Sequence, residues 1–176
     1  MKELETGEVI ITQGDLQKRI AELGKSISED YKGKDPVLIC VLKGAVIFMA
    51  DLIRTIPIPI AIDFLSISSY DAGRGESGAV RIIKDLDINI AKREVLVIED
   101  IIDTGFTLGY LLRILKARNP ASLKVAVLLD RPALRIVDLP VEYKGFEIPD
   151  EFVVGYGLDY KENFRQLPYI CKLKTA

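Results

Sequence analysis

Three short runs of mainly apolar residues constrain the fold of this chain more than any other feature of its sequence. They cover residues 37–42, 95–98 and 123–129, and each has the length of a β-strand rather than of a helix. A strand that is apolar at nearly every position is buried on both faces, as in a parallel sheet covered by helices. The runs therefore predict an α/β fold, with a mostly parallel central sheet flanked by helices.

The segments between these runs carry helical signals. Apolar residues recur at helical spacing across residues 16–27, and either Thr12 or Asp15 could cap the start of that helix. Two further helices are predicted over residues 45–55 and 107–118. The alternation of strands and helices supports the α/β assignment.

Two strands, over residues 58–69 and 80–84, are predicted around a segment of different composition. Residues 70–79 hold three glycines among small and charged side chains, which is typical of a mobile loop. From residue 140 the chain carries short β-like pieces, aromatic residues and prolines. We expect residues 140–176 to form a small hood over the edge of the sheet, within a single domain of residues 1–176.

The composition excludes several classes of protein. Lys and Arg number 24 against 26 Asp and Glu, and this balance gives no electrostatic sign of a nucleic-acid partner, although a local basic patch stays open. No apolar stretch approaches the roughly 20 residues of a membrane-spanning helix, and the first residues lack the layout of a signal peptide. Cys40 and Cys171 form no CxxC motif, and Cys40 lies inside the apolar run of residues 37–42, which favours a buried thiol there. A cytoplasmic location fits this pattern.

The chain contains no histidine. This removes the commonest general base, the usual zinc ligand and every mechanism that pairs histidine with serine or cysteine. Acid–base chemistry and metal binding must therefore depend mainly on carboxylates.

The segment most indicative of chemistry is residues 95–107, VLVIEDIIDTGFT. An apolar strand is followed by acids and by small or hydroxyl residues, where the chain turns into a helix: Glu99, Asp100, Asp103, Thr104, Gly105 and Thr107. Ligands of open α/β sheets bind at the carboxyl ends of the strands, and a Gly- and Thr-containing turn before a helix can bind phosphate. Acids beside a phosphate make sense if the ligand also carries a ribose and a divalent cation.

A purely structural reading of the same segment is a strand followed by a helix that Asp103 or Thr107 caps. Capping explains one such residue, but not three acids and two threonines within nine positions. The segment is neither a Walker loop nor a dinucleotide-binding GxGxxG motif.

The sequence VLVIEDIIDTG resembles the phosphoribosyl-pyrophosphate motif of the type I phosphoribosyltransferases. Over nearly its full length the chain is similar to the hypoxanthine-guanine phosphoribosyltransferase family, in its short bacterial form. This likeness is carried by VLKG at 41–44, SSYD at 68–71, LLDRP at 128–132, GFEIPDEFVVGYGLDY at 145–160 and FRQLPYI at 164–170.

The resemblance implies the type I phosphoribosyltransferase fold and an activity in purine salvage. Such enzymes transfer the 5-phosphoribosyl group from phosphoribosyl pyrophosphate to hypoxanthine or guanine, with magnesium, and give IMP or GMP plus pyrophosphate. Xanthine stays open as a third base. The resemblance also implies a homodimer or homotetramer, small-molecule substrates, and no nucleic-acid or membrane partner.

For the phosphoribosyl group, the resemblance assigns roles to residues around the motif. Glu99 and Asp100 would bind the ribose hydroxyls, partly through magnesium. Asp103 would lie near N7 of the purine as the general base. The 5′-phosphate would lie in the loop formed by Asp103, Thr104, Gly105, Phe106 and Thr107.

For pyrophosphate, the resemblance assigns the loop of Lys43 and Gly44, preceded by a cis peptide bond, and also Arg165. Ser69 and Tyr70 would open a loop that closes over the reacting centre and excludes water. Without the family likeness, Lys43 and Arg165 would be read as solvated surface residues and Tyr70 as a strand-end aromatic.

For the base, Phe152 would stack on the purine, Val153 would offer backbone hydrogen bonds, and Asp159 would contribute to a second magnesium. The alternative for Phe152 is core packing. Arg131 replaces the lysine that donates to O6 and N7 in most relatives. Because a guanidinium is bulkier and planar, the preference among hypoxanthine, guanine and xanthine stays open.

Two alternatives remain. One is a phosphoribosyltransferase for adenine or a pyrimidine, which the FVVGYGLDY segment at 152–160 disfavours. The other is a regulator of the same fold that binds phosphoribosyl pyrophosphate without catalysis. The presence of Glu99, Asp100, Asp103 and Asp159 disfavours that alternative.

Overall fold

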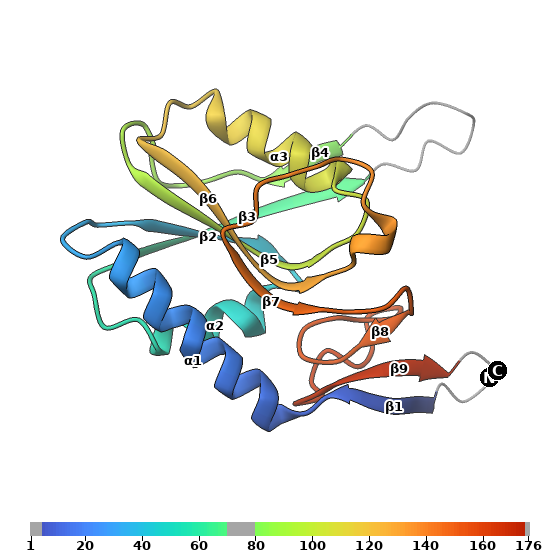
Figure 1. Ribbon diagram of the computed structural model, residues 1–176. Helices are drawn as coiled ribbons and strands as arrows, with labels where there is room; N and C mark the ends of the chain where they lie inside the picture. Colours follow the sequence, from blue (N-terminus) through green and yellow to red (C-terminus); the bar gives the residue numbers. More distant parts are fainter. Residues whose placement is uncertain (1–4, 70–79, 175–176) are drawn as a thin grey trace.

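The computed structural model describes residues 5–69 and 80–174 and contains two sheets (Figure 1). The larger has six strands in the order β4-β3-β2-β5-β6-β7, and the smaller has three in the order β1-β9-β8. The elements are β1 (Glu5–Ile11), α1 (Gln13–Asp30), β2 (Val37–Leu42), α2 (Val46–Arg54), β3 (Ala61–Ser69), β4 (Val80–Lys84), β5 (Glu94–Ile102), α3 (Phe106–Lys116), β6 (Ser122–Asp130), a 3₁₀ turn (Pro132–Leu134), β7 (Tyr143–Glu147), β8 (Val153–Val154) and β9 (Ile170–Lys174).

The larger sheet is mostly parallel, as the apolar runs predict. β2 pairs in parallel with β3 and β5, and β6 pairs in parallel with β5 and β7. Only β4 is antiparallel, to β3. The α/β fold class expected from the sequence is confirmed.

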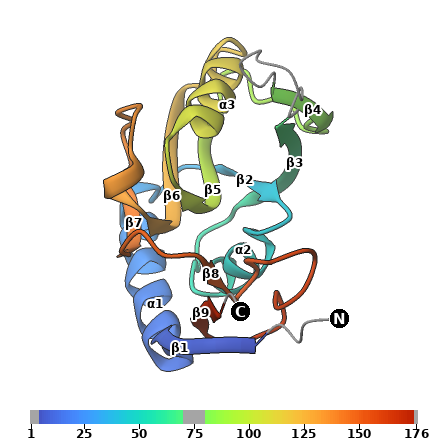
Figure 2. The same ribbon diagram turned by 90° about the vertical axis from the view of Figure 1, so that its right-hand side faces the viewer.

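Helices cover both faces of this sheet, with α1 and α2 on one side and α3 on the other (Figures 1 and 2). The side chains of each central strand alternate between the two layers. In β2, Leu38 and Cys40 pack in the cluster that contains α1 and α2, whereas Val37 and Ile39 pack in the cluster that contains α3. All four are fully buried. Burial on both faces explains why the run is apolar at successive positions.

The helices predicted over 45–55 and 107–118 lie within one or two residues of the observed α2 and α3, whereas α1 extends three residues beyond the apolar pattern of residues 16–27 at each end. Thr12 is the N-cap of α1, and its hydroxyl oxygen accepts a hydrogen bond from the backbone N–H of Asp15 at 3.2 Å. Within the two described stretches of chain, no helix has the length and apolar character needed to cross a membrane.

The tail of the chain differs from the expectation in one respect. Residues 143–147, which the sequence analysis assigns to the hood, form β7 and extend the main sheet by pairing with β6. The reason is that Tyr143 is buried beside Ala126, so this edge strand completes the core. The rest of the tail supplies β8 and β9, and β9 pairs with both β8 and β1. β1 was not expected from the sequence.

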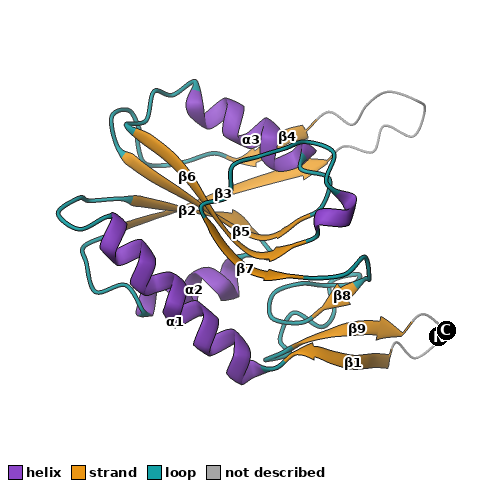
Figure 3. Cartoon of the chain, viewed as in Figure 1, coloured by secondary structure: helices purple, strands orange, loops and turns teal. Residues whose placement is uncertain are grey.

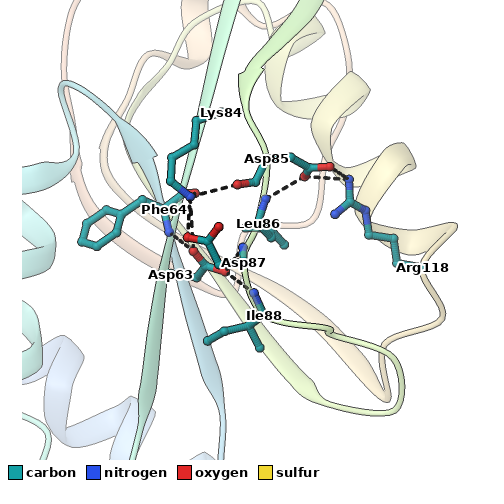
Figure 4. A network of polar contacts seen from close by, with 8 residues as sticks. All are labelled: Asp63, Phe64, Lys84, Asp85, Leu86, Asp87, Ile88 and Arg118. Atoms are coloured by element: carbon teal, nitrogen blue, oxygen red, sulfur yellow. Dashed lines mark hydrogen bonds and ion pairs between the residues drawn. The ribbon is translucent and has the colours of Figure 1, made fainter.

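A buried carboxylate on β3 fixes the chain that follows β4 (Figure 4). Asp63 is 4% exposed and accepts hydrogen bonds from the backbone N–H groups of Phe64 at 2.7 Å and of Asp87 and Ile88 at 2.8 Å. Lys84 lies 3.7 Å from the Asp63 carboxylate and 3.0 Å from that of Asp87. Because these backbone groups depend on one side chain, Asp63 holds the turn that leads into β5.

Candidate functional site

The candidate site lies at the carboxyl edge of the main sheet, where three parallel strands end. The loop after β2 carries Lys43 and Gly44, the end of β5 carries Glu99 and Asp100, and Arg131 follows β6. Figure 3 shows loops at this edge, beside the small sheet. Two adjacent pockets open here, and Asp103 lines both of them.

The smaller pocket, of about 170 Å³, is formed by the turn between β5 and α3. Asp103, Thr104, Gly105 and Thr107 line it. Gly105 is the N-cap of α3 at φ +85°, and a Cβ there would lie 2.8 Å from the carbonyl oxygen of Val137, so this position needs glycine. The first N–H groups of a helix have no partner within the helix, which makes this turn a natural anion site.

Phe106 in the same turn does not close the pocket. Its side chain is 57% exposed, and its backbone N–H lies 3.4 Å from the hydroxyl of Thr104. A phosphate bound by backbone N–H groups is compatible with any side chain that points away from it.

The turn is supported from behind by residues that were not expected from the sequence. The backbone N–H groups of Ile136 and Val137 donate to the carbonyl oxygen of Thr104 at 3.0 and 2.9 Å. Arg135 donates from Nε to the carbonyl oxygen of Asp103 at 3.1 Å, and its guanidinium also pairs with the buried carboxylate of Asp130.

Lys144 on β7 lies 2.5 Å from the other oxygen of Asp130. The only signal in the sequence was Asp130 itself, an acid at the end of an apolar strand. Such a residue, once buried, needs cationic partners.

Glu99 and Asp100 are carboxylates whose surroundings raise their pKa values. Glu99 is 7% exposed, and its Oε2 has no hydrogen-bond partner among the described residues. Burial, followed by the charge of Asp100, raises the pKa of Glu99 well above the usual range. Burial also raises the pKa of Asp100 to about 6, although the backbone N–H of Ile101 donates to it at 2.7 Å. Both groups would be stabilised as anions by a cation or by ribose hydroxyls.

Gly44, which follows Lys43, allows the loop after β2 to lie close to Asp100. A Cβ on Gly44 would lie 1.5 Å from Oδ2 of Asp100. A Cβ on Gly157 would lie 2.1 Å from the carbonyl oxygen of Gly44, so the C-terminal segment packs on the same loop. The peptide bond between Leu42 and Lys43 is cis, as the resemblance predicts.

The three carboxylates assigned to magnesium do not form one preformed cluster. Within the described residues, no group of three or more metal-ligating side chains is close enough to hold an ion. Asp100 and Asp159 line the larger pocket and Glu99 lines the smaller one. This donor set still fits magnesium, which usually binds one or two carboxylates together with substrate oxygens and waters.

The larger pocket, of about 330 Å³, has a mixed lining suited to a flat heterocycle. Its walls include Asp100, Asp103, Arg131, Phe152, Val153 and Asp159. Phe152 is 52% exposed and meets the ring of Tyr160 edge-on, with 5.7 Å between the ring centroids. The alternative that Phe152 packs in the core is therefore wrong. Val153 is buried in β8.

Arg131 is 8% exposed and connects the walls of this pocket. Its Nη2 donates to the carbonyl oxygen of Glu151 at 2.8 Å, and its Nη1 lies 3.8 Å from Asp150. Its Nε lies 3.4 Å from Oδ1 of Asp103, and neither of these two buried atoms forms a hydrogen bond within residues 5–69 and 80–174. One arm of the guanidinium is thus already engaged, which limits how it can meet a base.

Arg165 is held beside Asp159. Its Nη2 lies 2.7 Å from Oδ1 of Asp159, and its Nη1 donates to the carbonyl oxygen of Gly157 at 2.7 Å. Lys43 lies 3.1 Å from Glu162. Ser69 ends β3, whereas Tyr70 and the loop expected over 70–79 lie outside the described residues, so their proposed roles stay predictions.

Comparison with known proteins gives a consistent result. Residues 10–161 match the family described as "Phosphoribosyl transferase domain". The chain is 48% identical over 174 residues to the hypoxanthine-guanine phosphoribosyltransferase of Streptococcus thermophilus, covering 99% of this chain and 97% of that protein. It is 49% identical over 170 residues to the hypoxanthine phosphoribosyltransferase of Salmonella typhimurium, covering 96% of each.

The fold agrees with that of a solved relative. A crystal structure of a hypoxanthine-guanine phosphoribosyltransferase from Bacillus anthracis superposes with a TM-score of 0.91 at 44% identity. The match covers 98% of this chain and 100% of that one.

Proposed function

This chain belongs to the phosphoribosyltransferase family, in its hypoxanthine-guanine branch, and from that premise we propose how its residues carry out the reaction. The enzyme transfers the 5-phosphoribosyl group from phosphoribosyl pyrophosphate to hypoxanthine or guanine in purine salvage. The observation that carries the assignment of residues is the pair of adjoining pockets, one suited to a phosphate and one to a base, with Asp103 between them.

In this assignment the base lies in the larger pocket, stacked on Phe152, and the 5′-phosphate lies in the turn of residues 103–107. N9 of the base forms a bond to C1′ of the ribose as the bond from C1′ to the pyrophosphate oxygen breaks. The proton on N7 moves to the carboxylate of Asp103, and the electron pair of the broken bond leaves with pyrophosphate. Asp103 suits this role because its side chain is 44% exposed and faces both pockets.

Glu99 and Asp100 would hold the ribose hydroxyls. As C1′ gains positive charge, their carboxylates stabilise it, and the buried setting strengthens that interaction. We propose that Glu99 and Asp100 would hold one magnesium ion and that Asp159 would contribute to a second; when bound, magnesium would neutralise charge on the leaving pyrophosphate. Lys43 and Arg165 would provide cationic partners for the same group.

Arg131 would set the choice of base. Its Nη2 is engaged with Glu151 and its Nε lies 3.4 Å from Asp103, so Nη1 is the donor that we assign to O6 of the purine. The guanidinium could donate to N7 only after N7 has lost its proton. We propose that hypoxanthine and guanine are accepted on this basis, and that acceptance of xanthine depends on how far the guanidinium can move.

For the molecule as a whole, we propose that residues 1–176 work as one domain, with the part of residues 140–176 that follows β7 contributing a hood over the base site. We also propose a cytoplasmic homodimer or homotetramer. The family likeness and the two buried, unpaired cysteines support these proposals. Light scattering coupled to size-exclusion chromatography would measure the oligomeric state, and a monomer would contradict that part.

The test of the activity is a parallel assay. The protein, phosphoribosyl pyrophosphate and magnesium are incubated with hypoxanthine, guanine, xanthine or adenine, and the nucleotides are separated and quantified. We expect IMP and GMP and no AMP. Formation of AMP alone, or of no nucleotide with any of the four bases, would overturn the proposal.

A further inference from the structure

Lys43 and Arg165, the two cationic side chains assigned to pyrophosphate, share one carboxylate. Nζ of Lys43 lies 3.1 Å from Oε2 of Glu162, and Nη2 of Arg165 lies 3.5 Å from Oε1 of the same residue. Each carboxylate oxygen thus faces one cation. A diphosphate would present a similar pair of anionic oxygens to the same two groups.

The backbone around Glu162 does not explain why a glutamate stands there. Lys161 and Glu162 are the central residues of a two-residue turn between Tyr160 and Asn163, which exchange backbone hydrogen bonds of 3.1 Å. Their φ values are +51° and +63°. Turns with positive φ at both central positions favour Asn-Gly or Asp-Gly, whereas this chain places two long charged side chains there. The backbone of the turn would favour glycine at position 162, so the reason for glutamate lies in its side chain.

The ion pair of Glu162 with Lys43 is much more exposed than the ion pair of Arg165 with Asp159. The side chains of Lys43 and Glu162 are 66% and 67% exposed. Exposed ion pairs of this kind are weak and easily exchanged. Arg165 and Asp159, by contrast, are 26% and 27% exposed and lie 2.7 Å apart. Arg165 can therefore keep its place beside Asp159 while Glu162 moves away.

We infer that Glu162 is a displaceable internal counter-ion of the pyrophosphate site: it pairs with Lys43 and Arg165 when no diphosphate is bound and competes with diphosphate for them. The inference rests on the proposed function for the identity of the diphosphate. Glu162 is then a positioning residue that weakens pyrophosphate binding and favours release of this product.

The test is the variant Glu162→Gln, which keeps the size of the side chain and removes its charge. Two quantities are measured: the inhibition constant of inorganic pyrophosphate against phosphoribosyl pyrophosphate at fixed magnesium, and the dissociation constant of pyrophosphate by calorimetric titration into the protein. We expect both constants to fall by about two- to fivefold, the size of effect typical of an exposed ion pair. Tighter binding is a gain that local damage to the fold would not produce.

Glu8→Gln is the matched control. Glu8 is a surface glutamate on β1 whose carboxylate lies 3.1 Å from Lys172, the same separation as between Glu162 and Lys43, and it lines neither pocket. Pyrophosphate constants in this variant should equal those of the unmodified protein. An equal fall in both variants would overturn the inference, because the effect would then come from net charge.

A second variant, Glu162→Gly, guards against a change in the turn itself. Glycine adopts positive φ freely, so this variant should melt no lower than the unmodified protein and should also bind pyrophosphate more tightly. Unchanged or weaker pyrophosphate binding in both variants, in a protein that forms IMP normally, overturns the inference and leaves the proposed function intact. An unmodified protein that forms no nucleotide overturns the proposed function instead.

Discussion

Replacement of Asp100 by asparagine should stabilise the ligand-free protein although it removes a residue assigned to substrate binding. Burial raises the pKa of this carboxyl from 3.8 to about 6. That difference corresponds to about 3 kcal/mol, the extra cost of ionising Asp100 in the folded protein relative to the unfolded chain. Asparagine has the same shape and no charge, and its side-chain oxygen can still accept from the N–H of Ile101.

The gain should depend on pH in a defined direction. Below about pH 4 the carboxyl is protonated in both states, so the pKa difference contributes nothing to stability. Between about pH 4 and pH 6 the unfolded chain releases this proton while the folded protein keeps it, so the stability of the unmodified protein falls. Above about pH 6 the full cost applies, and the variant should be more stable by about 1–3 kcal/mol, after allowance for relaxation around the charge.

Urea unfolding of both proteins between pH 4 and pH 8, without magnesium or substrate, measures this difference. In thermal unfolding it should appear as an increase of about 2–4 °C in Tm for each kcal/mol. Asp138→Asn, at an exposed position, serves as a control that should show no such gain. The reasoning is refuted if Asp100→Asn is less stable than the unmodified protein at pH 7.5, or if the difference between them does not change with pH.

Three further predictions concern single side chains. Asp103→Asn should lower kcat by about 10-fold or more, because a positioned acid or base contributes at least that much, and an unchanged kcat with chemistry rate-limiting would remove Asp103 from the role. Arg131→Lys should change KM for the purine bases more than KM for phosphoribosyl pyrophosphate, and steady-state kinetics with the opposite pattern would show that Arg131 does not contact the base. Asp63→Asn should reduce the free energy of unfolding by about 3 kcal/mol, because asparagine has only one accepting oxygen and its NH2 group must then face either the N–H of Phe64 or the N–H groups of Asp87 and Ile88; a loss below about 0.5 kcal/mol in urea unfolding would contradict this.

The central strands could be predicted from the sequence because a strand that is buried on both faces is apolar at successive positions. Residues 37–42 and 95–98 are apolar at each position, and no other environment explains such short runs as well. β1, β8 and β9 leave a weaker pattern in the sequence. β8 has only two residues, most of β1 is exposed or half-buried, and the small sheet depends on pairing between the two ends of the chain. β7 was misassigned for the same reason: its place in the main sheet is set by β6.

In the candidate site, too, some contacts could be predicted from the sequence and others could not. Glu99, Asp100 and Asp103 follow one strand closely, so their proximity could be inferred from spacing alone. The support that Arg135 gives to the turn could not, because it depends on Asp130 and on a side chain from β7. The pairing of Lys43 with Glu162 joins residues 119 positions apart and leaves no local pattern.

The central claim is that the two adjoining pockets bind the two ends of one nucleotide. A crystal structure of the protein with IMP and magnesium tests this claim directly. We predict that the 5′-phosphate lies in the turn of residues 103–107, that the base lies against Phe152 in the larger pocket, and that the ribose hydroxyls face Glu99 and Asp100. Density for the nucleotide elsewhere on the protein, with the turn of residues 103–107 empty, would contradict the account.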